Sequence, residues 1–150
     1  MKGIKMSDCK FYVDEAARTV VCVIPRTRNM VLDFIWDNFQ YSDINLADSI
    51  EYRMRNELYM PGSFMGKAVC APDDEWNEET GRIIAFSRAK NKCYQSFFKR
   101  ANLFIQTLDR RLGDAITSFN DFGMRLEDKK EALRTIIDER IGALDSSEEE

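Results

Sequence analysis

Residues 64–92 read FMGKAVCA, then PDDEWNEETG, then RIIAFSRAKNK. The first segment has the composition of a short strand, the second that of an acidic turn, and the third that of the start of a long basic helix. This order separates a sheet-forming part from a helical part. We therefore predict a single α+β domain over residues 1–145, with a sheet half of about 1–72, a helical half of about 73–145, and a disordered acidic tail at 146–150.

Two further strand-forming segments lie near the N-terminus, at residues 10–13 and 19–24. The residues between them fit a hairpin loop. The second segment is an unbroken apolar run, which predicts a central strand covered on both faces and ended by Pro25. Two shorter helices are predicted at 30–39 and 45–58, so the N-terminal half contains a small antiparallel sheet and two helices.

After Arg82 the chain contains one long apolar repeat, whose members recur mostly at steps of three and four: Ala89, Cys93, Phe97, Ala101, Phe104, Leu108, Leu112, Ala115, Phe119, Phe122 and Leu126. This spacing is typical of a coiled-coil-like seam. The seam is predicted to pack on another copy of the chain, or on a last helix at 127–144. An elbow at 120–123 would join the two helices, because Gly123 can adopt the left-handed cap conformation. The C-terminal half is thus expected to consist of long helices that form an oligomerisation arm.

The composition narrows the functional classes. The 150 residues include no histidine, which removes the commonest general base and metal ligand and excludes Ser–His and Cys–His nucleophiles. The four cysteines have no Cys-x-x-Cys spacing and are interpreted as reduced. No apolar run approaches the roughly 18 residues of a membrane span, and no signal-peptide core follows the basic start. We expect a cytoplasmic protein that is not an enzyme and needs no cofactor.

The acidic turn offers a possible metal site at Asp73, Asp74 and Glu75. Adjacent residues on a helix do not face one another, which argues against a shared ion. Acidic groups in a first helical turn instead complement the positive end of the helix dipole. We therefore predict that this turn starts the long helix and binds no metal.

A mixed line of side chains runs beside the seam on one face of the predicted helix, at Ile84, Arg88, Asn91, Gln95, Phe98 and Asn102. Arg110 extends its basic end. A flat ring, amides and a guanidinium group are what a nucleotide site requires. The alternative is that Phe98 packs on a neighbouring protomer and the amides are simply exposed.

The loop after the second strand is another candidate, because it carries Arg26, Thr27 and Arg28 before a predicted helix N-terminus. Free backbone N–H groups at such a position favour anions. The loop lacks the glycines of a phosphate-binding loop, so the pattern suggests an anion without specifying one.

In its length, the strand at 20–24 followed by Arg26 and Arg28, the segment 66–75 and the helix from Arg82, the chain resembles the phage-encoded anti-Thoeris sponge proteins of the first type described. The resemblance implies a homo-oligomer, dimer or hexamer, in an infected bacterial cell. It implies capture of a cyclic ADP-ribose isomer without cleavage, and in some members of cyclic oligonucleotides at a separate site. By this resemblance Arg28 holds a phosphate, while Phe86 or Phe98, and Asn91 or Asn102, contact the adenine.

A second pattern is similar to small double-stranded-RNA-binding-like domains of the β-β-β-α kind. It comprises the Gly-x-Ala-x-Cys-x-Pro-x-Asp sequence at 66–74, followed by Gly81, Ala85 and Arg88-Ala89. Such domains need a basic outer face to meet phosphates, whereas the turn here is acidic. Nucleic acid is therefore not the expected partner, and a purely structural coiled-coil oligomer is the other alternative.

Overall fold

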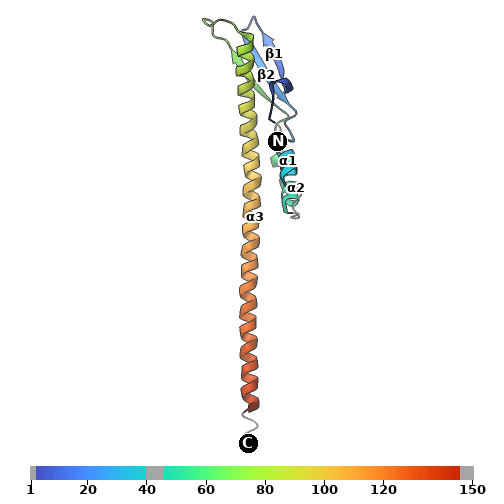
Figure 1. Cartoon of the computed structure of the whole chain (residues 1–150), viewed down its shortest axis with the longest axis vertical. Coiled ribbons are helices and arrows are strands. Elements are labelled where there is room, and N and C mark those ends of the chain that lie inside the picture. Colours follow the sequence, from blue (N-terminus) through green and yellow to red (C-terminus); the bar gives the residue numbers. More distant parts are fainter. Residues whose placement is uncertain (1–2, 40–45, 146–150) are drawn as a thin grey trace. The chain divides into compact units, whose positions relative to one another are not determined.

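A computed structural model describes residues 3–39 and 46–145. In chain order the elements are a short 3-10 helix η1 (Met6–Asp8), strands β1 (Lys10–Asp14) and β2 (Thr19–Pro25), helices α1 (Met30–Phe39) and α2 (Leu46–Leu58), strand β3 (Ser63–Val69) and helix α3 (Glu78–Asp145). The predicted α+β class, with a small antiparallel sheet and two helices ahead of the long helical part, is confirmed (Figure 1). The chain divides into two units after Leu108. The predicted tail at 146–150 lies outside the described residues.

The three strands form an antiparallel sheet in the order β1-β2-β3. Cys22 of β2 lies opposite Phe11 on one side and Gly66 on the other. The predicted central position of β2 is therefore confirmed. Its predicted cover on both faces is wrong, because burial alternates along the strand and only every second residue is fully buried. The half-buried Val21 and Val23 belong to the less covered face of the sheet.

Helix α3 crosses the covered face of the sheet at Gly66. A Cβ atom at this position would lie 2.0 Å from the carbonyl oxygen of Ala85 and 2.4 Å from the backbone nitrogen of Ala89. Ala85 and Ala89 are themselves fully buried. A glycine facing two alanines thus lets the backbones of sheet and helix approach each other directly. This approach sets the position of α3 on the sheet.

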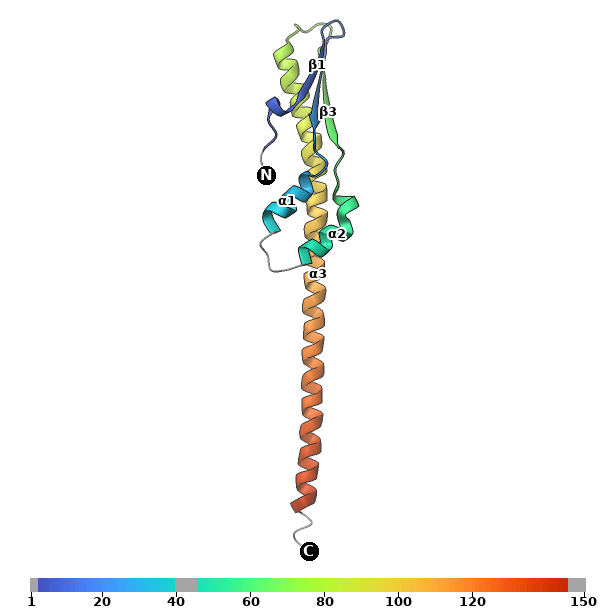
Figure 2. The same ribbon diagram turned by 90° about the vertical axis from the view of Figure 1, so that its right-hand side faces the viewer.

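Helices α1 and α2 lie along the following turns of α3 (Figure 2). The rings of Phe34 and Phe97 meet edge to face with centroids 5.6 Å apart. Phe39 and Phe104 do the same at 5.5 Å. The seam from Ala89 to Phe104 is therefore part of the core of the chain's own N-terminal unit. The prediction that the whole seam packs on another copy or on a last helix is wrong for this half.

Helix α3 is a single element from Glu78 to Asp145, so the predicted elbow at 120–123 is wrong. Gly123 lacks the positive φ angle that a left-handed cap requires. A glycine inside a helix costs only about 1 kcal/mol relative to alanine, which does not suffice to end it. The repeat therefore continues on one helix, and residues 127–144 do not form a separate one.

The start of α3 also differs from the prediction. Asn77 caps the helix, since its Oδ1 accepts a hydrogen bond from the backbone N–H of Thr80 at 2.8 Å. Asp73 and Asp74 lie before the helix, in a turn held by Arg18, whose guanidinium donates to the backbone carbonyls of Pro72 and Asp74. The dipole argument thus applies to Glu78 and Glu79 alone. None of the described helices is both long and apolar enough to cross a membrane.

The buried thiol of Cys22, in the core beneath the sheet, leads to one prediction about how stability depends on pH. Burial, and then the neighbouring thiol of Cys9, raises the pKa of Cys22 from 9.0 to about 12. The unfolded chain loses this proton above about pH 9 while the folded chain keeps it, so Cys22 lowers stability as the pH rises from about 9 to about 12 and has no effect below that range. We expect Cys22→Ala to lose less stability than the wild type between about pH 8 and about pH 10.5 in urea unfolding. An equal loss in both proteins would contradict this assignment.

Candidate ligand-binding surfaces

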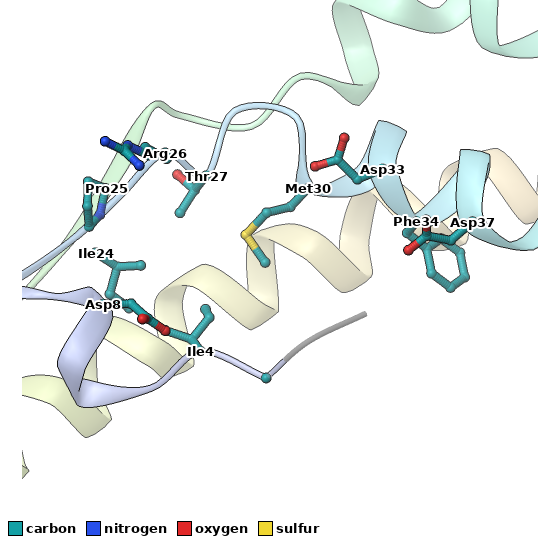
Figure 3. Close-up of a pocket in the computed structure, with 11 residues that line it drawn as sticks. Ile4, Asp8, Ile24, Pro25, Arg26, Thr27, Met30, Asp33, Phe34 and Asp37 are labelled. Carbon is teal, nitrogen blue, oxygen red and sulfur yellow. The ribbon is translucent and has the colours of Figure 1, made fainter.

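The loop between β2 and α1 forms one wall of a pocket of about 570 Å³ (Figure 3). Arg26 adopts a left-handed backbone conformation, with φ 59°, at the end of β2. Apolar side chains from the N-terminal segment, β2 and α1 form much of the lining, among them Ile4, Ile24, Met30 and Phe34. The pocket thus combines apolar walls with charged groups that come from separate elements.

The charges of this pocket are mainly negative. Asp8, Asp33 and Asp37 line it together with a single cation, Arg26. Three carboxylates repel a phosphate more than one guanidinium group attracts it. Across the part of the chain that the structure describes, no three histidine, cysteine or carboxylate side chains form a group that could hold a metal ion. This pocket is therefore a weaker place for a nucleotide phosphate than the sequence of its loop suggests.

Thr27 and Arg28 have structural partners in the same loop. The Thr27 hydroxyl, 1% exposed, donates a hydrogen bond to the carbonyl oxygen of Pro61. The guanidinium group of Arg28 lies over the ring of Tyr59, 4.6 Å from its centroid. The backbone carbonyl of Arg28 also accepts a hydrogen bond from the N–H of Met60 at 3.0 Å. The loop therefore fastens the start of α1 to the segment that leads into β3.

Arg88 and Lys92 lie along β3, a strand at the edge of the sheet. Arg88 donates to the backbone carbonyl of Lys67 at 2.6 Å, and Lys92 donates to that of Met65 at 3.2 Å. These contacts satisfy carbonyl groups of a strand that has a neighbour on one side only. The guanidinium group predicted to hold a phosphate is thus bound to the sheet.

The other members of the mixed line remain open to solvent. Phe98 is 64% exposed, although its ring lies near those of Tyr94 and Phe97. Asn91 and Asn102 are exposed on the same helix. Phe86, the alternative aromatic candidate, is half-buried, and the Nζ of Lys90 lies 5.4 Å from its ring centroid. Phe98 is therefore the more accessible of the two rings for stacking.

Asn102 also lines a hollow of about 380 Å³, whose other lining residues are Glu57, Lys99, Arg100, Leu103 and Gln106. Lys99 and Arg100 outnumber the single carboxylate of Glu57. Arg100 donates to the backbone carbonyl of Tyr59 at 2.9 Å, the residue whose ring lies under Arg28. Tyr59 thus links two cations that are far apart in sequence. We call Phe98, Lys99, Asn102 and Gln106, which lie within about one third of the helix circumference, the α3 surface.

Comparison with protein-family models, with curated proteins and with solved structures gave no match. The assignment of a site therefore rests on geometry.

The structure brings only some of the predicted residues together. Phe98 and Asn102 lie one turn apart on α3, and Arg26 and Thr27 line the same pocket. Arg110 is exposed in the second unit. Sequence reasoning missed Lys99, Arg100 and Gln106. Lys99 and Gln106 lie three and four residues from Asn102, and this spacing is the signal that could have identified them.

Proposed function

We propose that this protein binds and sequesters a cyclic nucleotide signal, with a cyclic ADP-ribose isomer as the first candidate. The observation that carries the proposal is the 64% exposure of Phe98 on a folded helix, one turn before Asn102, which lines a hollow together with Lys99. An open ring can stack on a base, an amide can read the edge of the base, and cations can hold phosphates. The α3 surface combines all three groups within two turns of one helix.

Capture without cleavage is the mode that we propose. The chain contains no histidine to act as general base at this surface. Binding alone requires only the stacking and charge that the α3 surface offers. The biological setting would be an infected bacterial cell, in which a phage protein removes an immune signal. Cyclic oligonucleotides are a second class of ligand that the binding experiment described below can test.

We also propose that the protein acts as a homo-oligomer. Every described residue from 109 to 140 is exposed, and these residues include large apolar side chains at helical spacing. A helix of this kind is stabilised by packing its apolar face on a partner. This observation also favours a second candidate function, that of a purely structural coiled-coil protein. Only the first candidate requires the α3 surface.

Phe98→Ala separates the two functions. We expect this change to weaken capture of a cyclic ADP-ribose isomer by about tenfold or more, because stacking of one base is worth roughly 1–3 kcal/mol. The measurement is equilibrium dialysis, followed by heat denaturation and chromatography of the released ligand. Tyr52→Ala, which removes an aromatic ring that is 80% exposed on α2, is the matched control and should bind as the wild type does.

The outcomes of this experiment distinguish sequestration from the alternative functions. Recovery of intact ligand supports sequestration, whereas a hydrolysed product would show an enzyme. If the wild type retains no cyclic nucleotide at all, the proposed function is wrong and the structural alternative stands. Binding to duplex RNA that weakens steeply with salt would instead favour an RNA-binding module.

A further inference from the structure

We propose that the solvent-facing side of α3 in the first unit binds single-stranded nucleic acid, RNA or DNA, over several nucleotides. This inference goes beyond the proposed function, because it assigns a second class of ligand and uses side chains outside the α3 surface. We call Arg88, Asn91, Lys92 and Gln95, together with the α3 surface, the basic face. All of its side chains are exposed, and they lie within about one third of the helix circumference.

The charges of the basic face have one sign. From Thr80 to Leu108 the sequence contains six basic residues and no aspartate or glutamate, although the whole chain carries 26 acidic residues against 22 basic ones. Three of the six belong to the basic face: Arg88, Lys92 and Lys99. Glu57 of α2 is the carboxylate that lines the hollow beside Lys99. The acidic residues that argued against nucleic acid lie before Thr80. The basic face therefore attracts an extended anion.

The fold fixes two of these cations before a ligand arrives. Arg88 and Lys92 each donate one hydrogen bond, to the backbone carbonyls of Lys67 and Met65. A guanidinium group has five N–H donors and an ammonium group has three, so most of their donors remain for phosphates. Neither side chain has a further protein partner within residues 3–39 and 46–145. Holding the cations in place lowers the entropy cost of binding.

The spacing of the cations favours a chain of nucleotides. Arg88 and Lys99 are eleven residues apart in one helix, which corresponds to about 16 Å along its axis. A stacked strand carries one phosphate about every 3.4 Å, so about five nucleotides span this distance. A single small nucleotide is too short to lie along the whole face, whereas a strand can meet all three cations.

The uncharged side chains favour nucleic acid over another polyanion, such as an acidic peptide. The exposed ring of Phe98 lies among the cations and offers a platform for a base. Asn91, Gln95 and Asn102 add amides that can bond to base edges. Both kinds of contact require bases that are not paired in a duplex. The strand that this face fits is therefore single.

Fluorescence anisotropy with a labelled oligoadenylate of about ten nucleotides, made once as RNA and once as DNA, tests the proposal. We expect a dissociation constant of about 1–100 µM at about 50 mM salt. Three phosphate contacts predict a slope of about −2 for the logarithm of the binding constant against that of the salt concentration. Binding of either form supports the proposal, and the tighter form identifies the preferred sugar. No binding of either form at about 100 µM protein would overturn it.

A charge-removing variant locates the site. Lys92→Gln combined with Lys99→Gln removes two charges and keeps an N–H donor for the carbonyl of Met65. The slope should change to about −0.7, and binding should weaken by about tenfold. Lys90→Gln is the matched control, because Lys90 lies on the other side of α3, with its Nζ 5.4 Å from the ring centroid of Phe86. Equal effects of both variants would overturn the assignment to the basic face.

Two comparisons complete the test. The same oligoadenylate in a duplex should compete at least about tenfold less well, since its bases cannot stack on Phe98. Equal competition would overturn recognition of a single strand. Lys92→Gln alone should weaken strand binding and leave capture of a cyclic nucleotide unchanged. A wild type that binds the strand but retains no cyclic nucleotide would contradict the proposed function only, and the reverse result would contradict this inference only.

Discussion

Gly66→Ala is expected to destabilise the N-terminal unit by about 3 kcal/mol or more, a large effect for the addition of one methyl group. The new Cβ atom would lie 2.0 Å from the carbonyl oxygen of Ala85, a backbone atom that no rotamer change can move aside. Helix α3 would have to shift away from the sheet, and the tightly packed contacts around Ala85 and Ala89 would be lost together. Urea unfolding followed by circular dichroism measures the loss.

The same change at Gly62 is the control. No heavy atom lies within 4 Å of a Cβ built at Gly62, and its backbone has no positive φ angle. Gly62→Ala should therefore leave stability within about 0.5 kcal/mol of the wild type. If Gly66→Ala were equally harmless, the close approach of sheet and helix would not hold in solution.

Phe104→Ala is expected to cost about 3–5 kcal/mol of unfolding free energy. Phe104 is fully buried and its ring meets that of Phe39 edge to face. Removing it leaves a cavity between α3 and the end of α1 that the neighbouring side chains can fill only in part. Thermal and urea unfolding of the variant measure this cost.

Phe119→Ala is the informative comparison, because the two phenylalanines belong to the same apolar repeat. Phe119 is 75% exposed, so its removal should change the unfolding free energy of the N-terminal unit by less than about 0.5 kcal/mol. It should instead weaken self-association. Equal destabilisation of the N-terminal unit by both variants would contradict the division of the repeat into a core half and an exposed half.

The strands could be predicted because their signals are local. Strand β2 is a run of mainly β-branched residues that ends at Pro25, and β1 carries the strand-forming residues Phe11, Tyr12 and Val13, so both segments favour an extended backbone. The cover of β2 could not be read in this way, since an apolar run looks the same whether one or both faces are packed. Gly66 carries that information, but only once Ala85 and Ala89 are known to lie against it.

The apolar repeat predicted a helix correctly and its partners only in part. Periodicity shows which face of a helix is apolar, and Phe104 and Phe119 occupy equivalent positions in that periodic pattern. Which half meets the chain's own sheet and helices depends on where α1 and α2 fold back, and that contact is non-local. The elbow at 120–123 was predicted from glycine and asparagine, whose local preferences were too weak to end the helix.

The candidate site shows the same limit. The accessible ring, Phe98, and the amide of Asn102 were identified from their spacing along one helix. Arg88 and Thr27 have the residue types of a phosphate grip, yet both are bound to backbone carbonyls of the chain itself. The residue type alone does not show whether a polar side chain is free to bind a ligand or is already hydrogen-bonded to the backbone of a strand or a loop.

The two contacts from α3 to the edge of β3 also restrict how copies of this chain can join. With the carbonyls of Met65 and Lys67 occupied by Lys92 and Arg88, a strand from another molecule cannot pair along that stretch without displacing two charged side chains. Growth of the sheet into open-ended fibres is opposed at this edge. Closed assemblies built through helices can then form at high concentration with less risk of aggregation.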